Sequence, residues 1–453
     1  MTNGLLMFGA LAAGVAFVVV ATTRFKMHPF VALIVAAYGV GLAGGLSPQA
    51  TIAALTGGFG KTLSYIGIVI ASGCIIGLVL EKSGCALVMA NTMIRFIGQT
   101  RSVLAMSCTG ALVSIPVFCD SGYVILSPLI RSLARKTKQS LASFAVALSM
   151  GLYATHCLVP PTPGPMAAAG ELRADIGTVI VLGMLVAVPV IGMTLLYALF
   201  IGRRIYIDPG KPVVTEAVSS RTGEEVPRPT AGAAFSPIVI PVLLIALKSI
   251  SDLPARPLGD GQLRLLLGML GDPNAALFIG IFLAWFVVRR HGRNAFGAWC
   301  GEGLREAGTI ILITGAGGAL GGVLRETPMA GIVGEALASL DLGRFGIFLP
   351  FIVAVGLKTS IGSSTVALIT SASLLSHLLP AMGLGDGYGP ALATLSVACG
   401  SMMLSHVNDS YFWVITQMSS MSVAQGYRLI TVASAIAGVT GITTVFVLSL
   451  FLL

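Results

Sequence analysis

The ionisable side chains that lie inside long apolar stretches are the first candidates for chemistry in this sequence of 453 residues. They are Asp120, His156, Lys358, His377, His406 and Asp409. A charge at membrane depth is costly, so such residues mark a functional site by default. His377 lies near the exit of its apolar segment, where we expect an interfacial position, and it is set aside. The other five are candidates for a functional site.

Each of these five residues also has a structural interpretation, and the sequence leaves both open. Asp120 and Asp409 lie at positions where an Asp commonly caps a helix. His156 and His406 fit satisfied structural histidines equally well. Lys358 either offers its positive charge to an anionic ligand or extends its chain toward the membrane surface.

The candidates fall in four polar interruptions of apolar sequence. The interruptions are Cys119–Gly122, His156–Pro165, Ser360–Ser364 and Ser405–Ser410. The second holds four prolines in six residues, and it cannot stay helical because proline lacks a backbone donor and clashes with the preceding turn. We expect the four interruptions to meet near the middle of the membrane. Helix ends there present unpaired N–H groups and partial positive charge, which suit a carboxylate.

Hydroxyl groups accompany these helix ends. Ser121, Thr162, Ser363, Ser364 and Thr365 are neutral donors of the kind that bind hydroxyls, and together they favour a small hydroxylated anion over an apolar compound. The expected substrate-binding residues are Asp120, Ser121, Gly122, His156, Thr162, Lys358, Gly362, Ser363, Ser364, Thr365, His406, Asn408, Asp409 and Ser410.

The composition explains why such residues must be positioned inside a membrane. Charged residues make up 10% of the chain and hydrophobic residues 55%, whereas a soluble domain carries roughly 25% charged residues. The mean hydropathy is +0.93. These values exclude a cytosolic enzyme, a nucleic-acid-binding protein and a disordered scaffold. The seven cysteines form no CxxC pair, so neither a metal site nor a disulfide framework is indicated.

The apolar segments predict an all-α polytopic membrane protein made of two similar halves. Residues 1–201 contain spans at 5–22, 29–46, 62–80 and 177–200, a re-entrant hairpin at 102–130 and a broken span at 141–165. Residues 235–453 contain spans at 235–250, 273–288, 304–323 and 429–452, a hairpin at 345–380 and a broken span at 389–420. Short stretches at 85–98 and 329–341 occupy matching positions, and residues 202–234 form a cytoplasmic linker.

The number of crossings predicts that the halves are inverted. Each half crosses the membrane five times, and an odd number makes the second half start from the opposite face. The first hairpin then enters from the cytoplasm and the second from outside. Inverted repeats with broken elements in matching positions are the mark of a secondary transporter.

The basic residues set the orientation. With both termini outside, 19 of the 27 Lys and Arg residues fall in cytoplasmic segments, seven fall outside, and Lys358 lies in the second hairpin. This is the bias toward positive charge in cytoplasmic loops that a correct topology shows.

Other function classes have weaker support. No GxxxxGK[ST] loop is present, so this chain does not couple transport to ATP hydrolysis directly. A membrane-embedded metal enzyme is a remote alternative, because no HExxH motif occurs and the candidate ligands are scattered. The closed polar breaks in both halves argue against a passive channel. Sodium coupling stays open, because unwound backbone carbonyls can hold Na⁺.

Four runs resemble the gluconate permease family, the gluconate:proton symporters of the ion transporter superfamily. They are PVFCDSGYVIL from Pro116 to Leu126, HCLVPPTPGP from His156 to Pro165, GSSTVA from Gly362 to Ala367 and SHVNDSYFW from Ser405 to Trp413. Together with the order of spans, the resemblance covers essentially the whole chain.

The resemblance implies uptake of a small sugar-acid or hydroxy-acid anion with protons across a bacterial inner membrane. In such a membrane both termini, which the basic residues place outside, are periplasmic. The resemblance also implies an elevator-type mechanism and a homodimer. We expect no cofactor, with the proton as the coupling ion. Asp120, His156, His406 and Asp409 become the candidates for proton handling. The family also includes carriers of D-serine and other short hydroxy acids. One departure concerns Thr162, because the family pattern often has His there, and this leaves the proton route and the preferred substrate open.

Overall fold

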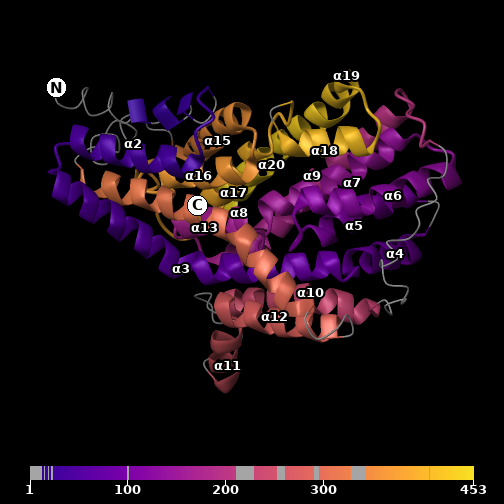
Figure 1. Ribbon diagram of the computed structural model, residues 1–453, viewed down its shortest axis with the longest axis horizontal. Helices are drawn as coiled ribbons and strands as arrows, with labels where there is room; N and C mark the ends of the chain where they lie inside the picture. The colour runs from indigo at the N-terminus through magenta and orange to yellow at the C-terminus, as the bar shows by residue number, and fades with distance from the viewer. Residues whose placement is uncertain are drawn as a thin grey trace.

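The computed structural model describes most of the chain. The described residues are 13–14, 16–18, 20–21, 24–98, 101–210, 229–251, 261–289, 295–327, 343–407 and 409–453. All regular elements in these ranges are helical (Figure 1). The expected span at 5–22 lies largely outside the described residues, and the stretch at 329–341 and the candidate Asn408 lie wholly outside them.

The helices follow one another in a similar order in the two halves. The first half contains α2 (Pro29–Ala43), α3 (Pro48–Lys82), α4 (Cys85–Ile97), α5 (Ser102–Val113), α6 (Cys119–Thr137), α7 (Leu141–Leu158), α8 (Pro163–Glu171) and α9 (Ile176–Gly202). The second half begins with α10 (Ala231–Ser251), α11 (Gln262–Leu270), α12 (Pro273–Val288), α13 (Ala295–Glu326) and the 3₁₀ turn η3 (Gly343–Ile347). It continues with α15 (Phe348–Ile361), α16 (Ser364–Leu375), the 3₁₀ turn η4 (Pro380–Met382), α17 (Gly389–Ser401), α18 (Ser410–Met418), α19 (Val423–Gly426), the π-helical turn η5 (Tyr427–Thr431) and α20 (Val432–Leu452).

Several helices are long and apolar enough to cross a membrane. By length and composition, five segments of the described chain qualify, and seven do if each of two bent pairs counts as one span. The chain therefore has the architecture of a multi-pass membrane protein. The count of ten spans stays a prediction.

Helices α3 and α13 are longer than the sequence indicated. They contain 35 and 32 residues, about 50 Å each at 1.5 Å per residue, whereas apolarity alone placed the spans at 62–80 and 304–323. The beginning of α3, residues 48–61, consists mostly of small residues with Gln49, two threonines and Lys61 among them, so a search for strongly apolar spans misses it. That beginning is nevertheless well specified, because Ser47 caps the helix and Pro48 occupies its first position.

Helices α3 and α13 cross in close contact along much of the long axis of the molecule (Figure 1). A Cβ atom on Gly58 would lie 2.3 Å from the carbonyl oxygen of Gly318 and 3.0 Å from the Cα of Gly322. Gly318 and Gly322 form a GxxxG pattern, which allows two membrane helices to approach closely. The two halves are therefore joined backbone to backbone.

The other contacts occur in matched pairs. Helix α2 packs on α13, and α12 packs on α3. Helix α5 packs on α7, and α15 packs on α17. Helix α16 packs on α8, and α6 packs on α18. The two segments expected as hairpins thus each contact the broken span of their own half and that of the other half.

Candidate functional site

Each segment expected as a hairpin consists of two helices with a short break. Residues Ser114–Phe118 separate α5 from α6, and the Ser114 hydroxyl donates to the carbonyl of Val117 at 2.9 Å. Gly362 and Ser363 separate α15 from α16. Gly362 has a φ of +90°, a conformation that favours glycine. The Ser363 hydroxyl accepts a bond from the Val366 N–H at 3.4 Å and caps α16.

The proline-rich interruption breaks the first long buried segment between α7 and α8. Pro160 and Pro161 are joined by a cis peptide bond. Thr162 is fully buried, and its hydroxyl lies 2.9 Å from the carbonyl oxygen of His156 and 2.8 Å from that of Val159. The only proton of this hydroxyl is thus used to close the break, so Thr162 offers a substrate at most an acceptor.

The second break, between α17 and α18, is held by side chains from its own half. Asp409 caps α18, because its Oδ1 accepts a bond from the Tyr411 N–H at 3.0 Å. The Ser405 N–H donates to the Ser434 hydroxyl at 2.9 Å, and the Thr431 hydroxyl donates to the Ser405 carbonyl at 2.6 Å. The break is therefore a defined structure.

A buried ion pair joins the second hairpin segment to the second break. The Lys358 Nζ lies 2.6 Å from Asp409 Oδ2, and the two side chains are 0% and 4% exposed. Lys358 also donates to the Gly362 carbonyl and, at 3.1 Å, to the Ser364 hydroxyl. These bonds use all three donors of the ammonium group. The alternative in which Lys358 extends toward the membrane surface is wrong, because the side chain is fully enclosed.

Buried tyrosines connect the two halves beside this pair, and the sequence analysis missed them. The hydroxyls of Tyr153 and Ser364 lie 2.6 Å apart, and Tyr153 also donates to the Ser401 carbonyl at 3.2 Å. Tyr411 donates to the Ser149 carbonyl at 2.9 Å, and its ring lies 5.4 Å from that of Tyr153. The available signal was a phenol inside an apolar helix, where its hydroxyl needs a partner.

The first hairpin segment brings Asp120 to the same place. The rings of Phe118 and His156 lie 5.8 Å apart, and the Asp120 carboxylate is close enough to Lys358 and Asp409 to interact with both electrostatically. Asp120 Oδ1 and His156 Nδ1 are buried and have no hydrogen-bond partner among the described residues. Unsatisfied buried polar atoms are rare and need an explanation, which a bound ligand would supply.

The remaining candidates are distributed around this centre or face away from it. The Ser121 side chain lies beside that of Glu81. Gly122 packs on Leu152, because a Cβ there would lie 2.7 Å from the leucine side chain. Thr365 lies against Gly164, and this contact brings the N-terminus of α16 to that of α8. His406 is half-buried and Ser410 is exposed.

The structure therefore gathers Asp120, His156, Lys358, Ser364 and Asp409 at the meeting point of the four breaks. Within the described ranges, no cluster of three or more His, Cys, Asp or Glu side chains has an arrangement that would hold a metal ion.

Comparison with known proteins identifies the family. A model of the GntP family permeases matches residues 6–451. The chain belongs to the GntP permease family. Its members are permeases, so this protein is a membrane transporter and not an enzyme, and no cofactor is expected. The resemblance found in the four sequence runs is thereby confirmed.

Relatives of this permease include proteins with named substrates. The chain is 32% identical to a gluconate permease of Pseudomonas aeruginosa over 438 residues, covering 96% of this chain and 95% of the relative. It is 33% identical to the D-serine transporter DsdX of Escherichia coli K12 over 445 residues, covering 97% of each.

A solved structure shares the fold. The YdaH transporter of Alcanivorax borkumensis is 14% identical and superposes with a TM-score of 0.67, over 94% of this chain and 98% of the other. At this identity the likeness concerns the fold alone, and the fold is that of a transporter.

Proposed function

We propose that this permease imports a small hydroxylated monocarboxylate, with gluconate as the leading candidate, together with protons across a bacterial inner membrane. The relatives named as a gluconate permease and a D-serine transporter support a small polar acid as the substrate class. The polar centre buried among apolar helices supports the same class, because intramembrane ionisable groups mark substrate and proton pathways.

The main support for proton coupling is the balance of charges at the centre. Lys358 is paired with Asp409 and has no donor left. Asp120 lies within electrostatic reach of this neutral pair, and one of its oxygens has no described partner. An anionic substrate beside an ionised Asp120 would be repelled, since like charges in a buried site disfavour each other. A proton on Asp120 removes the repulsion and supplies an O–H donor, so proton and acid bind best together.

Helix termini complete the binding site. The N-termini of α8 and α16 lie against each other at Gly164 and Thr365, and the tip at Asp120 begins α6. Their N–H groups and partial positive charges would hold the substrate carboxylate. Ser364 and Thr365 would bind its hydroxyl groups. His156 and His406 are further candidates to accept or donate the coupled proton.

We propose an elevator-type movement for the translocation step. Helices α5–α8 and α15–α18 are interlinked through the Lys358–Asp409 pair and the contacts of α6 with α18 and of α8 with α16, which supports one moving unit. The crossed helices α3 and α13 would form the static part. The matched packing pairs support two repeats, and their inverted arrangement and a homodimer are part of the proposal.

Uptake of labelled gluconate into proteoliposomes tests the proposal. An imposed inward proton gradient should drive accumulation above the external concentration, and a protonophore should abolish that accumulation. If accumulation persists without the proton gradient and instead requires an inward sodium gradient, proton coupling is wrong. If gluconate and related hydroxy acids neither enter nor compete, the substrate class is wrong.

D-serine is the second candidate substrate, and Asp120 gives a specific reason for it. The ammonium group of D-serine would pair with the Asp120 carboxylate, so a zwitterion would bind without a proton on that residue. A competition series with D-serine, D-glycerate and lactate, repeated at acidic and neutral pH, separates the two candidates. Gluconate binding should strengthen at acidic pH, whereas D-serine binding should weaken.

A further inference from the structure

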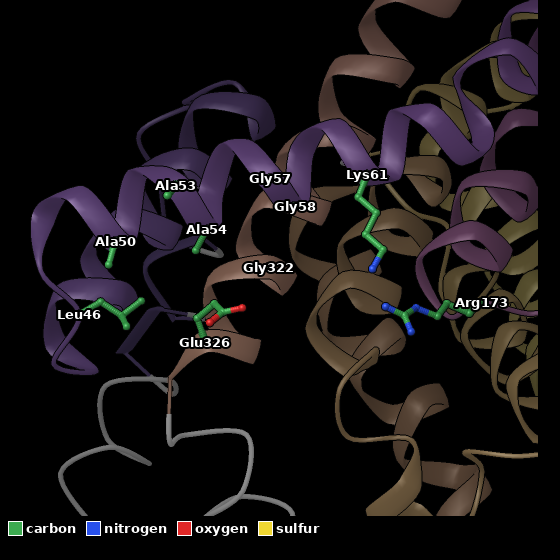
Figure 2. Close-up of a pocket in the computed structure, with 10 residues that line it drawn as sticks. All are labelled: Leu46, Ala50, Ala53, Ala54, Gly57, Gly58, Lys61, Arg173, Gly322 and Glu326. Atoms are coloured by element: carbon green, nitrogen blue, oxygen red, sulfur yellow. The ribbon is translucent and has the colours of Figure 1, made fainter.

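A cavity of about 580 Å³ lies apart from the central site. It lies between the first half of α3, the end of α13 and the end of α8 (Figure 2). Its lining residues are Leu46, Ala50, Ala53, Ala54, Gly57, Gly58, Lys61, Arg173, Gly322 and Glu326. The volume is within the range of about 300–1,000 Å³ that is typical of small-molecule sites.

Two cations converge in this cavity. Lys61 on α3 and Arg173 after α8 extend toward each other across the gap, and the Glu326 carboxylate points into the same space from α13 (Figure 2). Both cations are exposed, and neither forms an ion pair with a described residue. Two facing positive charges attract a carboxylate placed between them, and Glu326 offers an acceptor to hydroxyl groups.

Arg173 occupies a specialised backbone position. It has a φ of +54° at the end of α8, a conformation in which glycine is the usual residue. The N–H of Ala174 bonds to the carbonyl of Ala169 at 2.8 Å and closes the helix end. The chain therefore places a long cationic side chain where the backbone favours glycine.

The cavity lies one short helix from the centre. Helix α8 has nine residues and is about 13 Å long, and the break at Thr162 and the Arg173 residue lie just beyond its two ends. Helix α3 passes the same two places, because a Cβ atom on Gly73 would lie 2.7 Å from the carbonyl oxygen of Pro161, and Lys61, earlier in the same helix, lines the cavity. The orientation expected from the basic residues places Lys61 and Arg173 on the outer side.

From this arrangement we infer that the cavity is an outer vestibule in which Lys61 and Arg173 capture a small carboxylate anion before it reaches the central site. The identity of that anion as the transported acid rests on the proposed function. A cavity whose lining carries a net positive charge, here two cations against the single Glu326 carboxylate, raises the local concentration of anions and their association rate, and the effect falls with salt. The vestibule should therefore act on capture and leave the translocation step unchanged.

The labelling rate of a reporter cysteine in the cavity tests the electrostatic part of the inference without a transport assay. A reporter cysteine replaces Ala53 in a background carrying Cys108→Ser and Cys300→Ser, because the other native cysteines are buried. An anionic and a cationic methanethiosulfonate are applied to the purified protein, and their rates are compared. Lys61→Gln with Arg173→Gln should lower the anionic-to-cationic rate ratio roughly tenfold at low salt. An unchanged ratio overturns the inference.

The capture of substrate is tested by uptake from the outer face. The same pair of substitutions, without the reporter, should raise the half-saturating gluconate concentration about five- to tenfold at low salt and remove its salt dependence. The maximal rate of uptake should stay unchanged, and so should the gluconate concentration that half-saturates efflux from the inner face. The matched control is Lys248→Gln, a cation expected on the same face but paired with Asp272 at 3.8 Å, and it should change neither value.

The outcomes separate the two proposals. We call the ratio of the anionic to the cationic reagent's rate the reagent ratio. If this ratio falls but the gluconate concentration that half-saturates uptake from the outer face is unaltered, the vestibule does not capture substrate and the inference fails. If the unmodified permease takes up none of the tested acids, the proposed function fails, and the reagent ratio alone decides whether the vestibule attracts anions. If outer and inner half-saturation rise equally, the substitutions act on the central site, which also contradicts the inference.

Discussion

At the level of single residues, the pair of Lys358 and Asp409 determines the charge that a substrate meets. The two side chains come from different elements, α15 and the cap of α18, and both are buried. Removing one partner of a buried pair leaves an uncompensated charge, whereas removing both leaves none. The pair therefore has a structural role that can be measured separately from any role in transport.

Lys358→Met and Asp409→Asn should each lower the free energy of unfolding by about 3–5 kcal/mol. The asparagine side chain introduced by Asp409→Asn retains an oxygen that can cap α18, so the loss reports the unpaired charge of Lys358. The double variant should recover most of the stability, because neither charge is left buried. Thermal or denaturant unfolding in detergent provides the measurement, and a double variant no more stable than either single one contradicts the pairing.

An exposed ion pair is the matched control for this experiment. Lys248 and Asp272 lie 3.8 Å apart, with side chains 29% and 44% exposed. Lys248→Met should cost less than about 1 kcal/mol, as is usual for surface pairs. Equal losses for Lys248→Met and Lys358→Met would show that burial of the pair is not the cause.

Asp120→Asn tests the coupling residue directly. Asparagine has nearly the same shape as a protonated aspartate and carries no charge, so the variant should bind gluconate without a proton. Binding should become independent of pH, exchange of gluconate across the membrane should persist, and accumulation driven by a proton gradient should be lost. Counterflow and gradient-driven uptake are measured on the same proteoliposomes.

The control for Asp120→Asn is Ser121→Ala in the neighbouring residue, whose side chain lies beside Glu81. It should leave the proton dependence of accumulation intact. Accumulation by Asp120→Asn at the level of the unmodified permease would assign the proton to another residue, such as His156.

The sequence identified the charged members of the site but not their partners. Asp120, Lys358 and Asp409 were found because charge is rare inside apolar segments. The pairing of Lys358 with Asp409 was not predicted, because it is a long-range contact across 51 positions that no local pattern encodes. Thr162 was taken as a substrate donor for a different reason. Its hydroxyl proton is used by the backbone of its own break, through contacts three and six positions away whose geometry appears only in the folded structure.

At the level of elements, breaks were easier to predict than helix lengths. Proline, glycine and polar residues interrupt apolar runs where α7 ends and where α16 begins, and these signals are local. The length of α3 depends on packing instead. Its first half, which is rich in small residues, lies along α13 because glycines such as Gly58 allow the two backbones to meet. Hydropathy does not contain this relation.

Another glycine of α3 lies against the site. A Cβ on Gly77 would lie 2.2 Å from the carbonyl oxygen of Pro116, in the break before Asp120. Gly77→Ala should therefore push this break away from α3, cost about 1–3 kcal/mol of stability, and reduce the maximal uptake rate at least tenfold. Unfolding and uptake are measured on the same preparation.

Gly60→Ala is the control in the same helix. A Cβ at Gly60 meets no atom within 4 Å, so this variant should gain about 0.5–1 kcal/mol from the better helix propensity of alanine and transport normally. If Gly77→Ala behaves like Gly60→Ala, the close contact between α3 and the first break is needed neither for stability nor for transport.

At the level of the whole molecule, the two halves depend on each other. Arg131 of α6 donates two bonds to the Met418 carbonyl at the end of α18 and one at 2.9 Å to Ser420. The Tyr123 and Ser419 hydroxyls, 2.5 Å apart, add a second link. The site itself takes Asp120 and His156 from the first half and Lys358, Ser364 and Asp409 from the second, so neither half holds a complete site. An inverted arrangement would let a substrate reach this centre from either face of the membrane.

The inverted arrangement predicts that the two hairpin segments end on opposite faces. Lys138 follows α6 and Asp386 precedes α17, and both are accessible to solvent. In a background carrying Cys108→Ser and Cys300→Ser, we expect Asp386→Cys to react with an impermeant maleimide applied to intact cells. Lys138→Cys should react only after permeabilisation, as should the control Arg203→Cys, which lies at the cytoplasmic end of α9 in the expected topology. Labelling of Lys138→Cys and Asp386→Cys from the same face would contradict the inverted halves, because both hairpins would then enter from one side and the alternating access argued from them would fail.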